Sequence, residues 1–292
     1  MTRKNELIIT ADDFGLSPAI NRAITDLYIK KAVTRTSLLI NSEFTGNALS
    51  LMQKQCPDMP VGIHLTLTCG RCCSNTKDIP LLSDASGNMK LTYGKLLLLI
   101  MNPFTKKKIL RQIEIEFEAQ LMTLKKRNIR VSHMDGHQHV HMMPGIFPIV
   151  AKLAEKNAVP DVRIVNENFF LTRRSLNRTA KVSPAGLVKF VILKVFSIIA
   201  MSGQSRYFFS ILHSCRMKPG MIDFEKFIQL SDRFDVIEIM LHPGDGAYDN
   251  AYSDMIDPRE KKQALSPLRK DEYSAAIEIK MEIDRRKEMN QT

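Results

Sequence analysis

Short apolar runs alternate with stretches of helical periodicity along most of the chain. Apolar runs of about four to eight residues are typical of strands, whereas apolar residues spaced three and four apart are typical of helices. Strands that alternate with helices form βαβ units around a parallel sheet. We therefore predict strands over residues 6–11, 34–40, 61–68, 129–135, 162–165, 207–212 and 236–241.

The segments between these strands predict helices. Ser17 followed by Pro18 is a start signal, because serine accepts from the free N–H groups of a first turn and proline fits its first position. Ser42 and Thr105 are the expected caps of two later helices. The predicted helices cover residues 18–31, a segment after Ser42, 105–126, 144–156, 187–201, and segments that begin at Asp223 and Asp271.

This order of elements indicates an α/β fold. No internal repeat and no linker rich in Pro or Ser divides the chain, so we expect a single domain over residues 1–292. A pattern of about seven strands fits an irregular or incomplete (β/α) barrel better than a doubly wound sheet, and the pattern alone leaves both open.

The most distinctive polar segment lies between Ser132 and Met142, where imidazole and carboxylate groups recur at every second position. Neutral imidazole beside carboxylate is a ligand set of borderline divalent metals. Alternate residues of a strand share a face, and Gly136 and Pro144 then turn the chain into a loop. Core histidines or a solvated tract are the alternatives, but the surrounding Met, Val and Pro favour the rim of a metal pocket. The groups are His133, Asp135, His137, His139 and His141.

Further polar residues fall at the ends of predicted strands. Asp12 and Asp13 end the first strand, His64 lies in the third, and His242 follows the last. The C-terminal ends of parallel strands share one rim, where groups distant in sequence converge. Neighbouring strand residues point in opposite directions, so both aspartates reach one pocket only if the strand breaks into a turn, as Gly15 indicates. One carboxylate could then bind a metal while the other acts as a base.

The chain of 292 residues carries 42 Lys and Arg against 31 Asp and Glu, and this net charge of +11 favours anionic partners. Nucleic acid is nevertheless disfavoured, because the basic clusters fall mostly on predicted helices beside apolar stripes, without Trp or interleaved aromatic residues for base stacking. We interpret most of the clusters as solvated helix faces; they are residues 106–108, 125–127, 173–174 and 285–287.

Two apolar segments are candidates for contact with a membrane. Residues 187–200 are interrupted only by two lysines and a serine, and residues 96–101 precede the three lysines of 106–108. Neither segment reaches the roughly 20 apolar residues of a membrane span. Each suits either a buried helix or a helix that rests on an anionic bilayer with its lysines at the headgroups.

The cysteines and the N-terminal residues bear on the cell compartment. The five cysteines form no paired framework, and Cys69, Cys72 and Cys73 lack the second CxxC of a zinc ribbon. The short apolar run at residues 7–9 is followed at once by two aspartates, which is not the pattern of a signal peptide. We expect reduced thiols and a cytoplasmic protein, or one at the membrane periphery.

Three familiar catalytic motifs are excluded because the residues that normally accompany them are missing. Residues 13–15 match the DFG of protein kinases, but no glycine-rich loop, lysine strand or HRD precedes them. Residues 139–141 lack the HExxH spacing that places two ligands on one helical turn. No GxSxG elbow supports a Ser-His-Asp hydrolase.

Four sequence blocks resemble the YdjC-like carbohydrate deacetylase family, which includes chitooligosaccharide deacetylases. In order, they are TADDFGLS at residues 10–17, VGIHLTL at 61–67, SHMDGHQHVHM at 132–142 and EIMLHPG at 238–244. The resemblance implies an irregular (β/α) barrel that removes the N-acetyl group of an amino sugar with one divalent metal, Mg²⁺ or Zn²⁺. Residues 168–222 match none of these blocks and are expected to be an insertion or a cap that selects the substrate.

The resemblance also implies residue roles. Asp13, His64 and His137 would bind the metal, Asp12 would be the catalytic base, and His242 would lie near the reacting centre. An imidazole that titrates near neutral pH is suited to protonate the departing amine or to brace the oxyanion. The family often has a further histidine where this chain has Gln138, so that position carries no assigned role.

The remaining polar residues are expected around this centre. His133, Asp135, His139 and His141 fit positions that orient the metal ligands. Arg163 would pair with Asp12 or hold the sugar, and a purely structural ion pair is the alternative.

The expected partner is an N-acetylated amino sugar, in an oligosaccharide or linked to a lipid or nucleotide, and not nucleic acid. The basic charge and the apolar segments suit a lipid-linked or membrane-proximal sugar. A homodimer is also compatible with the sequence.

Two other functional classes remain. A metal-dependent phosphoesterase would use similar residues with more carboxylates around two metals, and a non-catalytic sugar- or metal-binding protein would need the pocket without the base.

Overall fold

The computed structural model describes residues 6–178, 180–200, 205–244, 261 and 264–289. In this part of the chain, six strands form one curled sheet in the order β4-β3-β2-β1-β6-β5, and every pair of neighbours is parallel. The predicted α/β fold with an incomplete barrel is therefore confirmed. The strands are β1 (Glu6–Phe14), β2 (Arg35–Leu38), β3 (Val61–Leu65), β4 (Val131–Gly136), β5 (Arg206–Phe209) and β6 (Val236–Leu241).

The seventh strand predicted at residues 162–165 is not a regular strand. Val162 forms a single parallel bridge with Met134 of β4, and Asn166 accepts through its carbonyl from the N–H of Phe208 in β5. The segment thus lies between the two outer strands. Its pairing ends early because the N–H of Asn166 turns back to the carbonyl of Ile164, which closes a three-residue turn and ends the extended backbone.

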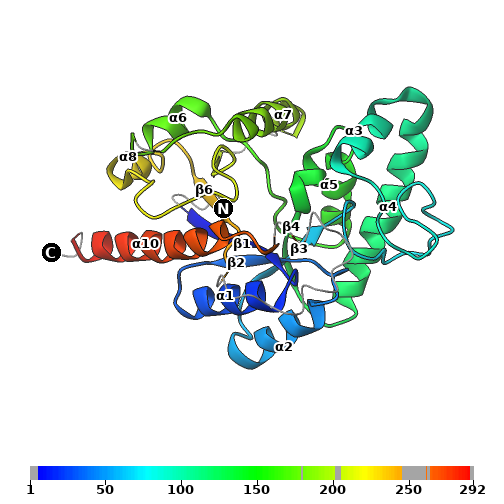
Figure 1. Cartoon of the computed structure of the whole chain (residues 1–292), viewed down its shortest axis with the longest axis horizontal. Helices are drawn as coiled ribbons and strands as arrows, with labels where there is room; N and C mark the ends of the chain where they lie inside the picture. Colours follow the sequence, from blue (N-terminus) through cyan, green and yellow to red (C-terminus); the bar gives the residue numbers. More distant parts are fainter. Residues whose placement is uncertain (1–5, 179, 201–204, 245–260, 262–263, 290–292) are drawn as a thin grey trace.

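Helices surround the sheet and connect its strands (Figure 1). Ser17 caps α1 as predicted, since its Oγ accepts from the N–H of Ile20 at 3.1 Å. The helices are α1 (Pro18–Ile29), α2 (Thr45–Gln55), α3 (Tyr93–Met101), α4 (Pro103–Lys125), α5 (Phe147–Lys156), α6 (Phe169–Arg174), α7 (Pro184–Ala200), α8 (Phe224–Ile228) and α10 (Leu268–Met289), with the 3-10 helix η1 (His137–Met142) directly after β4.

Two predicted caps are wrong. Helix α2 begins after Ser42 without a capping side chain, and the serine carbonyl accepts from the hydroxyl of Thr45 instead. Helix α4 is capped by Asn102, whose Oδ1 accepts from the N–H of Phe104 at 2.9 Å. Proline at residue 103 fixes the first helical position, so Thr105 falls inside the first turn.

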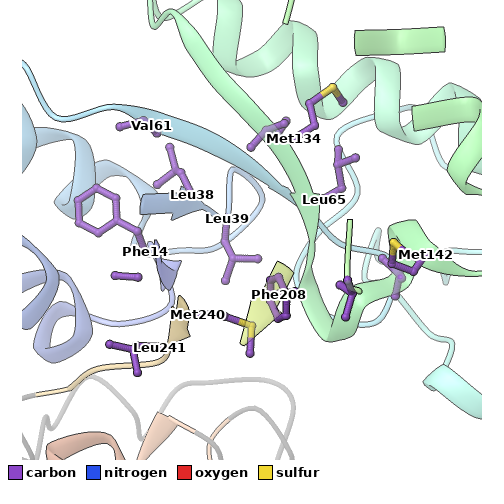
Figure 2. Close-up of a cluster of buried hydrophobic side chains, with 14 of the residues drawn as sticks. Phe14, Leu38, Leu39, Val61, Leu65, Met134, Met142, Phe208, Met240 and Leu241 are labelled. Atoms are coloured by element: carbon purple, nitrogen blue, oxygen red, sulfur yellow. The ribbon is translucent and has the colours of Figure 1, made fainter. Parts of the chain in front are cut away.

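The sheet carries the hydrophobic core. Figure 2 shows Leu38, Leu65, Met134 and Met240 from four strands of the sheet in one cluster of buried side chains. Burial of such side chains contributes roughly 1.5–3 kcal/mol each to stability. Residues 168–222, expected as an insertion or cap, contribute β5 to the sheet and α6 and α7 outside it. Among the described helices, none combines the length and apolar character that crossing a membrane requires.

Candidate functional site

Asp12 and Asp13 lie at a break in β1. Asp13 has a φ of 71°, and the register of β1 with β2 shifts at this point. Gly15 follows with a φ of 95°, and a Cβ there would lie 2.9 Å from the carbonyl oxygen of Leu39, so only glycine fits the turn. Both carboxylates are buried at the C-terminal end of the strand. The break that Gly15 indicated in the sequence is present.

Asp13 is grouped with two histidines from neighbouring parts of the sheet. Its Oδ1 lies 3.1 Å from Nδ1 of His137 and 3.6 Å from Nε2 of His64. One donor atom from each of the three buried residues lies within 4.8 Å of the others. A carboxylate with two imidazoles is a three-ligand set that leaves a coordination position for water or substrate. These residues therefore fit one divalent cation.

Asp135 fixes the orientation of His64. Its Oδ1 lies 2.7 Å from Nδ1 of His64, while its Oδ2 accepts from the hydroxyl of Ser37 at 2.6 Å. A carboxylate that holds one ring nitrogen directs the other toward a metal. Burial raises the pKa of Asp135, but Arg163 and His64 outweigh burial and hold this pKa well below its usual range.

Asp12 has a different environment from Asp13. Its two oxygens accept from Nη1 and Nη2 of Arg163 at 2.7 and 2.8 Å. Asp12, His64 and Asp135 also have ligand atoms close together. That second group shares His64, and both of its carboxylates are bound to Arg163, so it does not form an independent second metal site. The structure thus distinguishes the two aspartates, which their spacing in the sequence could not.

Arg163 is the central cation of this cluster and is 0% exposed. In addition to Asp12 it lies 2.9 Å from Asp135, and its Nε donates to Glu238 at 2.9 Å. Burial works against the charge of Arg163, but the three carboxylates outweigh burial and raise its pKa. Of the roles considered for this arginine, the contacts show the pairing with Asp12.

Replacing Glu238 with glutamine should make the unfolding free energy less dependent on pH in acid. Burial raises the pKa of Glu238, but Arg35 and Arg163 outweigh burial and lower it from 4.5 to about 2. A lowered pKa stabilises the fold above about pH 4.5, and this contribution disappears as the pH falls toward 2, because the unfolded chain binds the proton first. The integrated contribution is on the order of 3 kcal/mol.

Urea unfolding at several pH values between about 2 and 5 measures this slope for the wild type and for Glu238→Gln. Glu118→Gln is the control, because Glu118 pairs with Lys156 at the surface. Equal slopes for wild type and Glu238→Gln would contradict the buried ion-pair assignment.

His242 follows β6 and lies against α10. Its Nδ1 is 3.3 Å from Oε2 of Glu272, and its main-chain N–H donates to the same oxygen. Burial lowers the pKa of His242, but Cys215 and Glu272 outweigh burial and raise it well above its usual value. The imidazole can therefore hold a proton at neutral pH, which a general acid requires.

Arg269 of α10 was not among the residues singled out in the sequence. Its Nη2 donates to Oδ2 of Asp13 at 2.6 Å, and its Nη1 donates to the carbonyl of His242 at 3.4 Å. Arg269 therefore links Asp13 of the metal-binding group to His242, and it is buried, as is Glu272. The sequence did contain one signal for this position. Arg269, Glu272, Ala276 and Ile279 follow one another at spacings of three and four residues, so all four lie on one face of the helix, which is buried.

His133, His139 and His141 flank this group, and Nε2 of His133 lies 3.6 Å from Oδ2 of Asp135. His133 contacts Ser37 through Nε2 at 3.0 Å, and its ring occupies the space where a Cβ on Gly62 would be. His141 lies 3.2 Å from the carbonyl of Arg163, and burial lowers its pKa to about 4. His139 packs edge-on against Phe208. His133 and His141 thus contact the residues that surround the metal-binding group.

A cavity of about 430 Å³ adjoins this site. Gln138, the residue after His137, forms one part of its wall, and Tyr93 of α3 forms another. Helix α7 supplies the remaining residues, which are Val188, Lys189, Ile192 and Leu193. The cavity therefore extends from η1 toward the outside between α3 and α7.

The fold is an incomplete (β/α) barrel, and carboxylate and imidazole groups lie together at the C-terminal ends of its strands. The protein is therefore of the class of (β/α) barrels with a candidate metal centre. The model of the family described as YdjC-like protein matches residues 6–289. The chain belongs to this family.

Two similar proteins are named as a carbohydrate deacetylase and a chitooligosaccharide deacetylase. The chain is 39% identical over 155 residues to a carbohydrate deacetylase of Halalkalibacterium halodurans, covering 53% of this chain and 62% of that protein. It is 35% identical over 156 residues to a chitooligosaccharide deacetylase of Yersinia pestis, covering 53% of this chain and 57% of that protein. These matches span about 60% of the length of the relatives.

A similar fold occurs in a crystal structure of a proposed cellobiose-phosphate cleavage protein from Enterococcus faecalis. The TM-score is 0.56 and the sequence identity is 22%, with 94% of each chain covered. This likeness shows a shared fold over nearly the whole chain.

Proposed function

We propose that this protein hydrolyses the N-acetyl group of an amino sugar with the help of one divalent metal ion. The observation that carries the proposal is the group of Asp13, His64 and His137 beside the Arg163-bound Asp12. The names of the similar carbohydrate and chitooligosaccharide deacetylases support the choice of an acetylated sugar.

The surrounding residues fit the proton transfers of amide hydrolysis. A divalent cation bound by the three ligands would polarise the acetyl carbonyl and lower the pKa of a water molecule. Asp12, held in place by Arg163, accepts the proton of the attacking water through a carboxylate oxygen. His242, whose pKa is raised, donates a proton to the departing amine nitrogen. Acetate and a free amine are the products.

The donor set favours zinc over magnesium, and one metal over two. Mg²⁺ prefers oxygen ligands, whereas two imidazoles with one carboxylate suit Zn²⁺. A phosphoesterase with two metals would need a second ligand group, but the second group here shares His64 and is bound to Arg163. We therefore favour deacetylation with a single metal.

The test is acetate release from N-acetylglucosamine oligomers before and after metal removal. Chelation with EDTA should abolish the release, and added Zn²⁺ should restore it more effectively than Mg²⁺. Metal content measured in parallel should be one ion per chain. Two bound ions would favour a phosphoesterase. Bound metal without acetate release from any acetylated sugar, whether soluble or lipid-linked, would overturn the proposed activity.

A further inference from the structure

The positive charge of the protein is concentrated in two segments. Residues 85–113 and 168–222 together contain 15 of the 42 Lys and Arg and none of the 31 Asp and Glu. The rest of the chain has 27 basic residues against 31 acidic ones. All of the net positive charge therefore comes from these two segments, which contain α3, the start of α4, α6, α7, β5 and the loops beside them.

Helix α7 has an exposed apolar face as well as a buried one. Leu193 and Phe196 pack inward, at 2% and 8% exposure. The opposite face consists of residues spaced three and four apart, which is one side of a helix. Its members are Val188, Val191, Val195 and Ile198, all between 52% and 69% exposed. Apolar residues on both faces are typical of a helix that is covered on both sides.

Neighbouring segments add exposed apolar side chains next to exposed basic ones. At the junction of α3 and α4, Phe104 is 94% and Leu98 is 71% exposed, and the lysines of residues 106–108 follow directly. On α6, Phe170 is 80% exposed near Arg174. In Figure 1, α6, α7 and this junction lie along the upper edge, on the side away from α1 and α2.

We propose that this face rests on an anionic phospholipid bilayer and that the substrate is an N-acetyl sugar attached to a membrane lipid. Apolar helix faces enter the boundary between headgroups and acyl chains, while lysines reach the phosphates. An anionic glycan or a nucleic acid would match the charge but not the Val and Ile face of α7. The bilayer contact does not depend on the proposed function, whereas the lipid-linked substrate does.

The cavity beside Gln138 lies between this face and η1, the 3-10 helix that begins with His137 of the metal-binding group. Val188 belongs both to the exposed face of α7 and to the cavity wall, and Tyr93 closes the opposite side. An apolar aglycone can therefore follow the cavity from the bilayer while its sugar lies near His137. This arrangement assigns α7 to both membrane contact and substrate selection.

Flotation with vesicles tests the bilayer contact without any substrate. The protein should float with vesicles of phosphatidylcholine and phosphatidylglycerol at low salt and remain below with phosphatidylcholine alone. Replacing Lys106, Lys107 and Lys108 together with glutamine should weaken binding on the order of a hundredfold, because each basic residue near an anionic surface contributes about 1 kcal/mol. Failure of the wild type to float would overturn the proposal.

The same helix provides a matched charge control. Residues 125–127 are also three exposed basic residues, at the other end of α4 and about 30 Å away. Their replacement with glutamine changes the net charge equally and should leave flotation nearly unchanged. Equal losses from both triple variants would show unspecific attraction and would contradict a defined docking face.

A second pair of variants tests the apolar face. Ile198→Ser with Val195→Ser should reduce flotation at least tenfold. Met281→Ser with Ile29→Ser is the control, since these side chains are equally exposed on α10 and α1, at 67% and 52%. Unchanged flotation of the α7 variant would show that the face does not enter the bilayer.

Substrate choice is tested with a dodecyl glycoside of N-acetylglucosamine in phosphatidylglycerol vesicles and with soluble N-acetylglucosamine oligomers. The α7 variant should lose activity at least tenfold on the vesicle-bound substrate and keep it on the soluble one. Acetate release from soluble oligomers alone would refute the lipid-linked substrate but keep the proposed function. Flotation without acetate release from either substrate would refute the function but keep the bilayer contact.

Discussion

Asp13→Asn should remove the bound divalent cation and lower acetate release by about 10³-fold or more, because metal polarisation of the carbonyl contributes several kcal/mol to the rate. Asp13 supplies the one carboxylate among the three proposed ligands, between His137 and His64. Asparagine keeps an oxygen that can accept from Arg269, so the fold should persist. Metal content by mass spectrometry and acetate release measure the two effects.

Asp161→Asn is the control for loss of a carboxylate that is paired with arginine, although Asp161 is partly exposed. Asp161 is bound to Arg35 and Arg206. This variant should lose stability but keep its metal. If Asp13→Asn binds one equivalent of metal with wild-type affinity, the proposed ligand set is wrong.

The parts of the site close together in sequence were predictable. Gly15 indicated a turn at the two consecutive aspartates, and the structure has this turn. The strand ends of a parallel fold also predicted that His64 and the histidine segment would approach Asp13. These inferences depend on the periodicity of strands and on the conformations open to glycine, which local sequence determines.

The remaining features depend on contacts between distant residues. The distinction between Asp12 and Asp13 follows from Arg163, which lies 151 positions after Asp12. Arg269 and Glu272 reach the site from α10, and no local pattern specified where that helix packs. Similarly, the extended segment at residues 162–165 resembled a strand, but its pairing is limited by a turn at Asn166.

Helix α7 illustrates a limit of hydrophobic patterns. Its sequence suited both a buried helix and a helix on a bilayer, and the structure shows one buried face and one exposed face. Periodicity could not separate these alternatives, because nearly all positions are apolar and no polar stripe marks the solvent side. The position of the helix beside Gln138 and Tyr93 became evident only from the packed structure.

Asp12→Asn should retain the metal yet lower kcat by about 10²- to 10⁴-fold, the usual contribution of a general base. Asparagine preserves the size of the side chain and one oxygen for Arg163, so His64 and Asp135 should stay in place. KM should change little, because the base acts on the attacking water and not on the sugar. Steady-state kinetics with parallel metal analysis measures each quantity.

The combination of results distinguishes the base from a structural role. Loss of metal together with loss of rate would show that Asp12 supports the ligand group through Arg163 and Asp135. A near-normal rate with bound metal would remove Asp12 from the role of base, and Asp135 would then be the next carboxylate to test, since its ligand atom also lies close to those of Asp12 and His64. Full metal content with a large loss in kcat is the result that the geometry around Arg163 leads us to expect.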